Sequence, residues 1–239
     1  MIEYSMNLFV FSGRLRSGKD WIAEKIGCQI LSIAEPMYQA ADHFLGTRNK
    51  DLPYVRRFLQ LVGAWGRGEN PPTEEGLPTQ EVVTKEFKEN YAKIVDSRFH
   101  SVKWDEFGHN KNFWIDVTVS RANEETQRNP SLKLAIVNAR FQEEVDAFKN
   151  AGFVHFHVKC SNETRIKRIG EHYDPKMELD VTEAFSAKMD KDLTGTNVLW
   201  NDDAPNPGFT LASEFIRENG ALQAPTSFSG LGGGSVLCL

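Results

Sequence analysis

An apolar run, a glycine-bracketed turn and a helical pattern follow one another directly near the start of the chain. The run Leu8–Phe11 is long enough for one buried strand, and the turn reads G-x-x-x-x-G-K from Gly13 to Lys19. After Lys19, apolar residues recur at helical spacing. A strand, such a turn and a helix in this order are typical of a loop that holds phosphate with backbone N–H groups and a lysine. The pattern therefore predicts a phosphate-binding loop in an α/β protein.

The residue types of this loop suit the chemistry. Glycine reaches backbone dihedral angles that are closed to other residues, so Gly13 and Gly18 allow the chain to wrap an anion. Lys19 adds a mobile cation, whereas Arg16 can either contact donor phosphates or be solvated. The residues that we expect to bind the nucleotide are Gly13, Arg16, Ser17, Gly18, Lys19 and Asp20.

The residue after Lys19 departs from the usual form of the motif. Ser or Thr normally stands there and binds magnesium through its hydroxyl group, whereas this chain has Asp20. A carboxylate is a good magnesium ligand, although it is longer than a hydroxyl, and Mg²⁺ tends to keep several waters. We therefore expect Asp20 to hold the metal, largely through water.

Four further apolar runs have the length of short buried strands, and helical patterns separate them. The runs cover residues 29–33, 132–137, 153–159 and 197–200, and a last helix is expected over residues 209–218. Short apolar strands that alternate with helices indicate an α/β fold with a parallel five-stranded sheet covered by helices on both faces. Ligands of such sheets bind at the carboxyl ends of the strands, which is where the loop at Gly13 falls.

Composition restricts the class of protein further. A chain of 239 residues with 40% hydrophobic residues can build a substantial core, and its formal charge of −5 argues against a protein that coats nucleic acid. We expect no stable nucleic-acid complex and no membrane partner, because no apolar run approaches the length of a membrane span. Three dispersed cysteines suit a reducing compartment, so a cytoplasmic location is expected. The Gly-rich tail, residues 221–239, is expected to be flexible.

Taken in order, the motifs resemble those of the phage-type deoxynucleoside monophosphate kinases. The most specific match is Ser12-Gly13 followed by Arg16-Ser17-Gly18-Lys19-Asp20. The stretch Ser32–Met37 is similar to the family's Ser-Phe-Ala-x-Pro-Leu, and Phe113-Trp114-Ile115 resembles its Trp-containing helix start. Arg57, Leu59–Gly63 and Arg67 resemble its Arg, Leu-Gln-x-x-Gly and trailing Arg. The matches run across roughly residues 7–203.

The chain also departs from this family at several positions. Tyr38 stands where Lys is usual, and the stretch Ala139–Glu144 follows the family's Asp-Val-Arg-Phe-x-Asn-Glu with Asn138 and Glu143 replacing Asp and Asn. Asp180-Val181-Thr182-Glu183 is similar to the family's His-x-Ser-Glu but lacks the His. These departures leave the natural substrate open.

The resemblance implies a P-loop kinase fold over residues 1–220, with a helical acceptor-binding insertion around 50–125 and a lid around 161–185. It implies transfer of the γ-phosphoryl group of ATP, with Mg²⁺, to a small-molecule nucleotide, a deoxynucleoside 5′-monophosphate. The expected catalytic residues are Lys19, Arg140, Arg165 and Arg168. The expected acceptor-binding residues are Arg57, Arg67, Trp114 and Arg140.

Several of these side chains also have a purely structural interpretation. Arg165 and Arg168 share one helix face, which suits a lid but also a solvated surface. Trp114 can stack on a base or belong to the core. His155 and His157 share one face of a strand, where no third metal ligand is evident, so we expect a partly covered strand face there.

Two other functions are compatible with the motifs. One is a P-loop kinase that acts on a hydroxymethylated base or nucleotide during phage DNA modification. The other is an NTP-binding switch, although such proteins commonly need an Asp at a strand end, where this chain has Asn138. The sequence leaves the oligomeric state open between a monomer and a homodimer.

Overall fold

A computed structural model describes residues 7–94, 103–176, 181–192, 197–202 and 210–220. Within them, parallel strands form one six-stranded sheet in the order β2-β3-β1-β4-β5-β6. The strands are β1 (Leu8–Ser12), β2 (Gln29–Leu31), β3 (Leu134–Ile136), β4 (Val154–Lys159), β5 (Val198–Trp200) and β6 (Thr210–Leu211). The expected parallel sheet is therefore confirmed.

The predicted number of strands and the start of the last helix are wrong. The sequence predicts a helix from residue 209, but Thr210 and Leu211 pair in parallel with Leu199 and Trp200 as strand β6. The helix α9 (Ala212–Gly220) begins directly after them. A strand of two residues at the edge of a sheet is too short to leave an alternating pattern that could be read from the sequence.

Helices cover both faces of the sheet, and the alternation of side chains along the strands explains how. Leu8 and Val10 of β1 join the larger core, whereas Phe9 and Phe11 join a smaller one, because successive side chains of a strand point to opposite faces. The smaller core contains α1 (Lys19–Lys25) and α9. The larger core contains α2 (Glu35–Leu45), α3 (Pro53–Gly66), α5 (Phe113–Arg128) and α6 (Gln142–Asn150).

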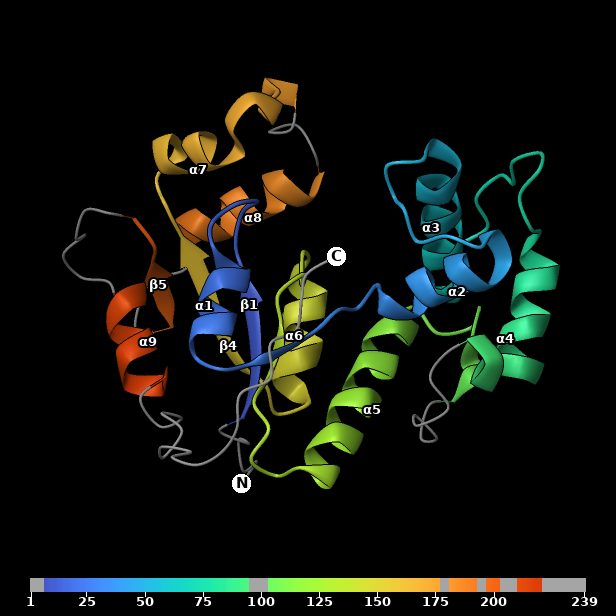
Figure 1. Ribbon diagram of the computed structural model, residues 1–239, viewed down its shortest axis with the longest axis horizontal. Coiled ribbons are helices and arrows are strands. Elements are labelled where there is room, and N and C mark those ends of the chain that lie inside the picture. Colours follow the sequence, from blue (N-terminus) through green and yellow to red (C-terminus); the bar gives the residue numbers. More distant parts are fainter. Residues whose placement is uncertain (1–6, 95–102, 177–180, 193–196, 203–209, 221–239) are drawn as a thin grey trace, which may run out of the picture.

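The helices α2 to α5 form a lobe beside the sheet (Figure 1). This lobe also holds α4 (Gln80–Ile94) and the short 3₁₀ helix η1 (Trp104–Glu106). Its centre is an aromatic cluster, with ring centroids 4.9 Å apart for Phe87 and Phe107 and 6.0 Å apart for Phe87 and Trp114. The lobe overlaps the predicted insertion around 50–125 but is larger, because α2 precedes residue 50 and α5 ends at Arg128. Residues 95–102 lie outside the described part.

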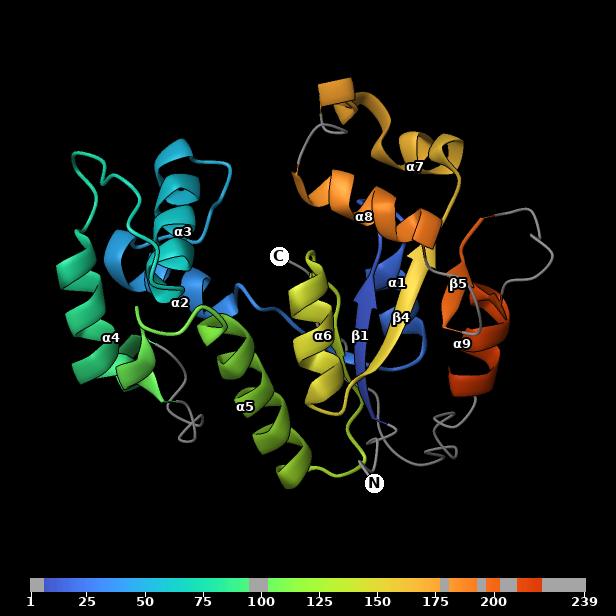
Figure 2. The same ribbon diagram turned by 180° about the vertical axis from the view of Figure 1, so that it is seen from behind.

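A second group of helices lies over the carboxyl ends of the strands. It consists of α7 (Asn162–Ile169), the 3₁₀ helix η2 (Gly170–His172) and α8 (Val181–Asp192). Figures 1 and 2 show α8 crossing above the ends of β1 and β4, with α7 beyond it. The predicted lid around 161–185 contains α7, η2 and only the start of α8, which continues to Asp192. Residues 177–180 lie outside the described part.

Membrane-spanning helices are not found in the part of the chain that the structure describes, since none there is both long and apolar enough. The predicted flexible tail, residues 221–239, lies outside the described residues.

Candidate functional site

A cavity of about 1050 Å³ opens where the chain leaves β1 and β3 in opposite directions. These strands are neighbours in the sheet, yet β1 leads into α1 on one face and β3 leads toward α6 on the other. Such divergence leaves a crevice at the carboxyl ends of parallel strands. The loop after β1 and residues 137–140 after β3 both contribute to the cavity wall.

The loop between β1 and α1, residues 13–18, requires glycine at both ends. Gly13 has φ +136°, and a Cβ atom there would lie 2.3 Å from the carbonyl oxygen of Val158. Gly18 has φ +96°, and its Cβ would lie 2.0 Å from Nδ2 of Asn201. Arg16 also has a positive φ of 62°, a region that side chains other than Gly seldom occupy. The loop is therefore held in an unusual shape by close contact with β4 and the end of β5.

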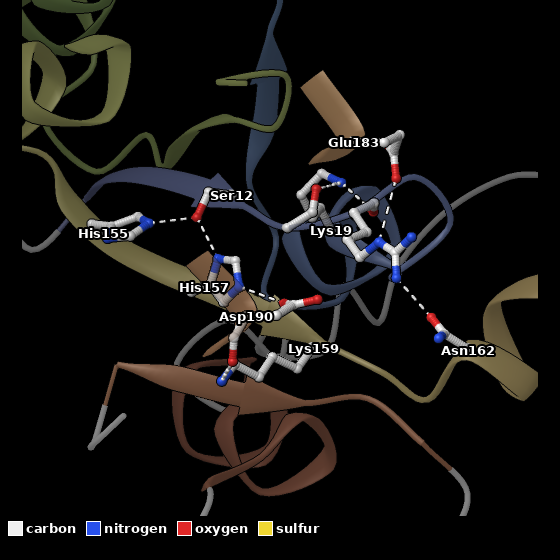
Figure 3. A network of polar contacts seen from close by, with 10 residues as sticks. Ser12, Lys19, His155, His157, Lys159, Asn162, Glu183 and Asp190 are labelled. Carbon is white, nitrogen blue, oxygen red and sulfur yellow. Dashed lines mark hydrogen bonds and ion pairs between the residues drawn. The ribbon is translucent and has the colours of Figure 1, made fainter. Parts of the chain in front are cut away.

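Lys19 lies folded across this loop (Figure 3). Its Nζ donates hydrogen bonds to the carbonyl oxygens of Gly13 at 2.7 Å and Arg14 at 2.9 Å. Burial lowers the pKa of Lys19 to about 8, while the nearby carboxylates of Asp20 and Glu183 act in the opposite direction. The amino group is thus mostly protonated at neutral pH. Lys19 lines the cavity, where an anion could replace its contacts with carbonyl groups.

The backbone N–H groups of Gly18 and Lys19 form no hydrogen bond with other described residues. Both residues line the cavity. Free donors beside a desolvated lysine are an arrangement that favours an anion, because each N–H group needs an acceptor once water is excluded.

Arg168 and Asn201 hold the outer side of the loop. Nη1 of Arg168 donates to the carbonyl oxygens of Arg16 at 3.4 Å and Ser17 at 3.3 Å, and its Nη2 donates to the carbonyl oxygen of Asn201 at 2.9 Å. The side-chain amide of Asn201 donates to the carbonyl oxygen of Ser17 at 2.8 Å. Both side chains line the cavity.

Arg140 reaches the cavity from the turn after β3. The carboxylate of Glu144 accepts hydrogen bonds from the backbone N–H groups of Arg140 at 2.6 Å and Phe141 at 3.2 Å, which fixes the turn at the start of α6. Burial raises the pKa of Glu144. Asn138, in the same turn, accepts a hydrogen bond from the N–H of Ile33 at 3.4 Å and donates to Oγ of Ser32 at 3.3 Å.

The cavity brings together seven of the residues that the sequence singles out, and leaves five elsewhere. Those that line it are Gly13, Arg16, Gly18, Lys19, Asp20, Arg140 and Arg168. Ser17 is a buried residue of the loop that does not line the cavity, and neither do Arg57, Arg67, Trp114 and Arg165.

The two arginines expected to bind the acceptor from the helical lobe are engaged with acidic neighbours. Arg57 lies 3.3 Å from the carboxylate of Glu74 and donates to the carbonyl oxygen of Pro72 at 2.9 Å. Arg67 lies 2.6 Å from the carboxylate of Glu69.

Trp114 belongs to the core of the lobe. Only 3% of it is exposed, its indole N–H donates to the carbonyl oxygen of Gly63 at 2.9 Å, and its ring lies against Gly66. Of its two sequence interpretations, the core one describes its place in this structure. Arg165 is also buried, with 1% exposed, and Nη1 lies 3.9 Å from the carboxylate of Glu183.

The two histidines of β4 lie on a partly covered strand face, with His155 half-buried and His157 buried, and both belong to a polar network (Figure 3). Oγ of Ser12 lies 2.7 Å from Nε2 of His155 and 2.7 Å from Nδ1 of His157. Nε2 of His157 lies 2.7 Å from the carboxylate of Asp190, which comes from α8. Burial and the neighbouring His157 lower the pKa of His155 to about 4, so it is neutral at pH 7. No group of three or more His, Cys, Asp or Glu side chains in the described residues is placed to hold a metal.

Several residues of the cavity could not be identified from the sequence. Lys50, Glu183, Ser186 and Asn201 line it, yet they come from separate segments without a shared pattern. Only Glu183 has a sequence signal, since it ends the stretch that resembles the family's His-x-Ser-Glu.

No protein-family model matches this chain, and a search of the curated proteins finds no match. The function is therefore argued from the residues and geometry of the cavity.

Proposed function

We propose that the protein is a P-loop kinase that transfers the γ-phosphoryl group of ATP to a deoxynucleoside 5′-monophosphate, giving ADP and a deoxynucleoside diphosphate. The observation that carries the proposal is Lys19, which is desolvated, charged and folded over a glycine-bracketed loop that lines the cavity. The type of reaction and the class of acceptor are inferred from the resemblance of the sequence motifs to those of the phage-type deoxynucleoside monophosphate kinases.

The donor nucleotide would bind at the loop. Phosphoryl transfer requires in-line positioning and cations that neutralise the charge of the transferred group. The N–H groups of Gly18 and Lys19, which bond to no other described residue, would supply these contacts together with the ammonium group of Lys19. Arg168 is next to the same loop and would add a guanidinium group once its bonds to loop carbonyls are exchanged for phosphate oxygens.

The acceptor phosphate would bind on the side of the cavity formed after β3. Arg140 is there, and its planar guanidinium group suits a terminal phosphate. Lys50 lines the same cavity and supplies a second cation. A cavity of about 1050 Å³ is large enough for nucleotides to enter, since typical ligand pockets have volumes of roughly 300–1,000 Å³.

Magnesium would be held by Asp20, and the donor set fits this ion. Asp20 brings a carboxylate to the cavity, and Mg²⁺ is usually held by one or two carboxylates together with waters and substrate phosphates. Asn138 stands after β3, at the strand end where P-loop enzymes often have an Asp that helps to hold the magnesium ion. Asp20 would take over that function. The ion would neutralise charge on the phosphates.

Asp20→Asn is expected to raise the magnesium concentration for half-maximal rate by roughly tenfold, the scale on which metal-site substitutions act. ATP binding in EDTA should stay the same or become slightly tighter, because a negative charge beside the phosphates is removed. Glu24→Gln is the matched control, since Glu24 is exposed one turn further along α1. A wild-type magnesium dependence in Asp20→Asn would mean that other residues hold the ion.

The proposed reaction is tested by incubating the protein with ATP and a panel of deoxynucleoside monophosphates, ribonucleoside monophosphates and hydroxymethylated DNA. We expect diphosphate product from at least one deoxynucleoside monophosphate. Phosphate transfer only to the modified DNA would establish the base-kinase alternative instead. ATP hydrolysis without any transfer would favour the NTP-binding switch.

A further inference from the structure

The carboxylate of Glu183 contacts the loop from α8 (Figure 3). Its Oε1 accepts a hydrogen bond from the backbone N–H of Leu15 at 2.9 Å. Its Oε2 lies 3.6 Å from Nε of Arg14 and 3.9 Å from Nη1 of Arg165. Both Glu183 and Leu15 line the cavity, and 13% of the Glu183 side chain is exposed. One carboxylate thus lies against a loop N–H group and two guanidinium groups.

These three donors are the kind that bind a phosphate group. Charge-assisted hydrogen bonds from guanidinium and backbone N–H groups hold carboxylates and phosphates alike, because both present anionic oxygens. The Glu183 carboxylate is also close enough to Lys19 to stabilise its ammonium form, as an incoming phosphate would. The Glu183 carboxylate therefore supplies the negative charge that a bound phosphate would otherwise bring to this part of the loop.

We infer that Leu15 N–H, Arg14 and Arg165 form a phosphate subsite, and that Glu183 occupies it until a nucleotide displaces its carboxylate. The inference rests on the proposed function and extends it, because it assigns Arg14 and Arg165 a ligand and makes Glu183 an internal competitor. The ligand class is a nucleoside triphosphate or diphosphate, or inorganic pyrophosphate.

The rest of α8 is attached independently of Glu183. Asp190 near its other end lies 2.7 Å from Nε2 of the buried His157, and its backbone carbonyl accepts a hydrogen bond from Lys159. Release of Glu183 would therefore leave this end of the helix on the sheet. A phosphate can displace the carboxylate because it brings more negative charge and more acceptor oxygens.

The test is the affinity of the full chain for ATP and for pyrophosphate, measured by isothermal titration calorimetry in EDTA so that no transfer occurs. Glu183→Gln should bind both ligands roughly three- to tenfold more tightly than wild type, the scale of one partly exposed ion pair. Glu163→Gln is the matched control and should bind as wild type, because it removes an exposed carboxylate from the neighbouring helix α7.

Glu183→Asp provides a second variant that keeps the charge and so preserves the interaction with the buried arginine. Its shorter side chain cannot reach Leu15 and both arginines equally well, so its affinity should lie between those of wild type and Glu183→Gln. Unchanged or weaker binding in both Glu183 variants would overturn the inference.

The failure of this inference can be told from the failure of the proposed function. If wild type binds ATP, Lys19→Ala does not, and the Glu183 variants show no tightening, only the subsite is wrong. If wild type and Lys19→Ala bind ATP equally, the proposed function and the subsite fail together.

Discussion

Lys19→Ala is expected to lower kcat/KM for phosphoryl transfer by at least about 10²-fold, the effect of removing one preorganised donor from a reacting group. The free energy of unfolding should change little, because among the described residues Nζ bonds only to the carbonyl oxygens of Gly13 and Arg14. Steady-state kinetics and thermal unfolding measure the two effects separately.

Lys25→Ala is the matched control for this substitution. Lys25 is an exposed residue in the last turn of the same helix, so its loss removes one positive charge away from the cavity. Its activity should equal that of wild type. Equal activity in Lys19→Ala and Lys25→Ala would refute the role of Lys19 in phosphate binding.

Gly13→Ala is expected to abolish ATP binding and to lower the free energy of unfolding by at least about 2 kcal/mol, which combines backbone strain and overpacking. The new Cβ would lie 2.3 Å from the carbonyl oxygen of Val158 in β4, and φ at this position is +136°. Either the loop or the central pair of strands must shift. In a chain of this size, about 2 kcal/mol lowers the Tm by roughly 4–8 °C.

Gly152→Ala separates the effect of backbone strain from the effect of a steric clash with the new Cβ atom. Gly152 also has a positive φ of 91°, but a Cβ there would meet no atom within 4 Å. It should cost only about 1 kcal/mol and leave ATP binding unchanged. If Gly13→Ala behaves like Gly152→Ala in both measurements, the close packing of the loop on β4 is not what shapes the site.

The sheet could be predicted because each of its longer strands is an apolar run of its own. Leu8–Phe11 is buried on both sides, so it has no polar alternation and stands out from the helices that follow. The pair Thr210–Leu211 was missed because it is held at the sheet edge by its neighbour β5 rather than by a pattern of its own.

The loop part of the cavity could also be predicted, since its glycines, Lys19 and Asp20 are consecutive in the chain. Arg140 could be predicted by the same reasoning because it directly follows a strand. Asn201 and Glu183 were not, because their contacts with Ser17 and Leu15 join segments more than 150 residues apart in sequence. The order of strands, which sequence patterns do not specify, decides such contacts.

Aromatic residues show a second limit of prediction from the sequence. A tryptophan at the start of a helix is compatible with base stacking or with the core, and residue type alone does not distinguish them. Trp114 is buried because Gly66 leaves room for its ring and Gly63 supplies an acceptor for its indole N–H. Both glycines lie in α3, which the sequence does not place next to α5.

The central claim is that the loop of residues 13–18 and Lys19 hold the polyphosphate of a nucleotide. A crystal structure with a non-hydrolysable ATP analogue and Mg²⁺ tests it most directly. We expect phosphate oxygens on the N–H groups of Gly18 and Lys19 and on Nζ of Lys19, with the bonds from Nζ to the carbonyl oxygens of Gly13 and Arg14 exchanged for them. An analogue whose phosphates lie away from this loop, with Lys19 still bonded to those carbonyls, would contradict it.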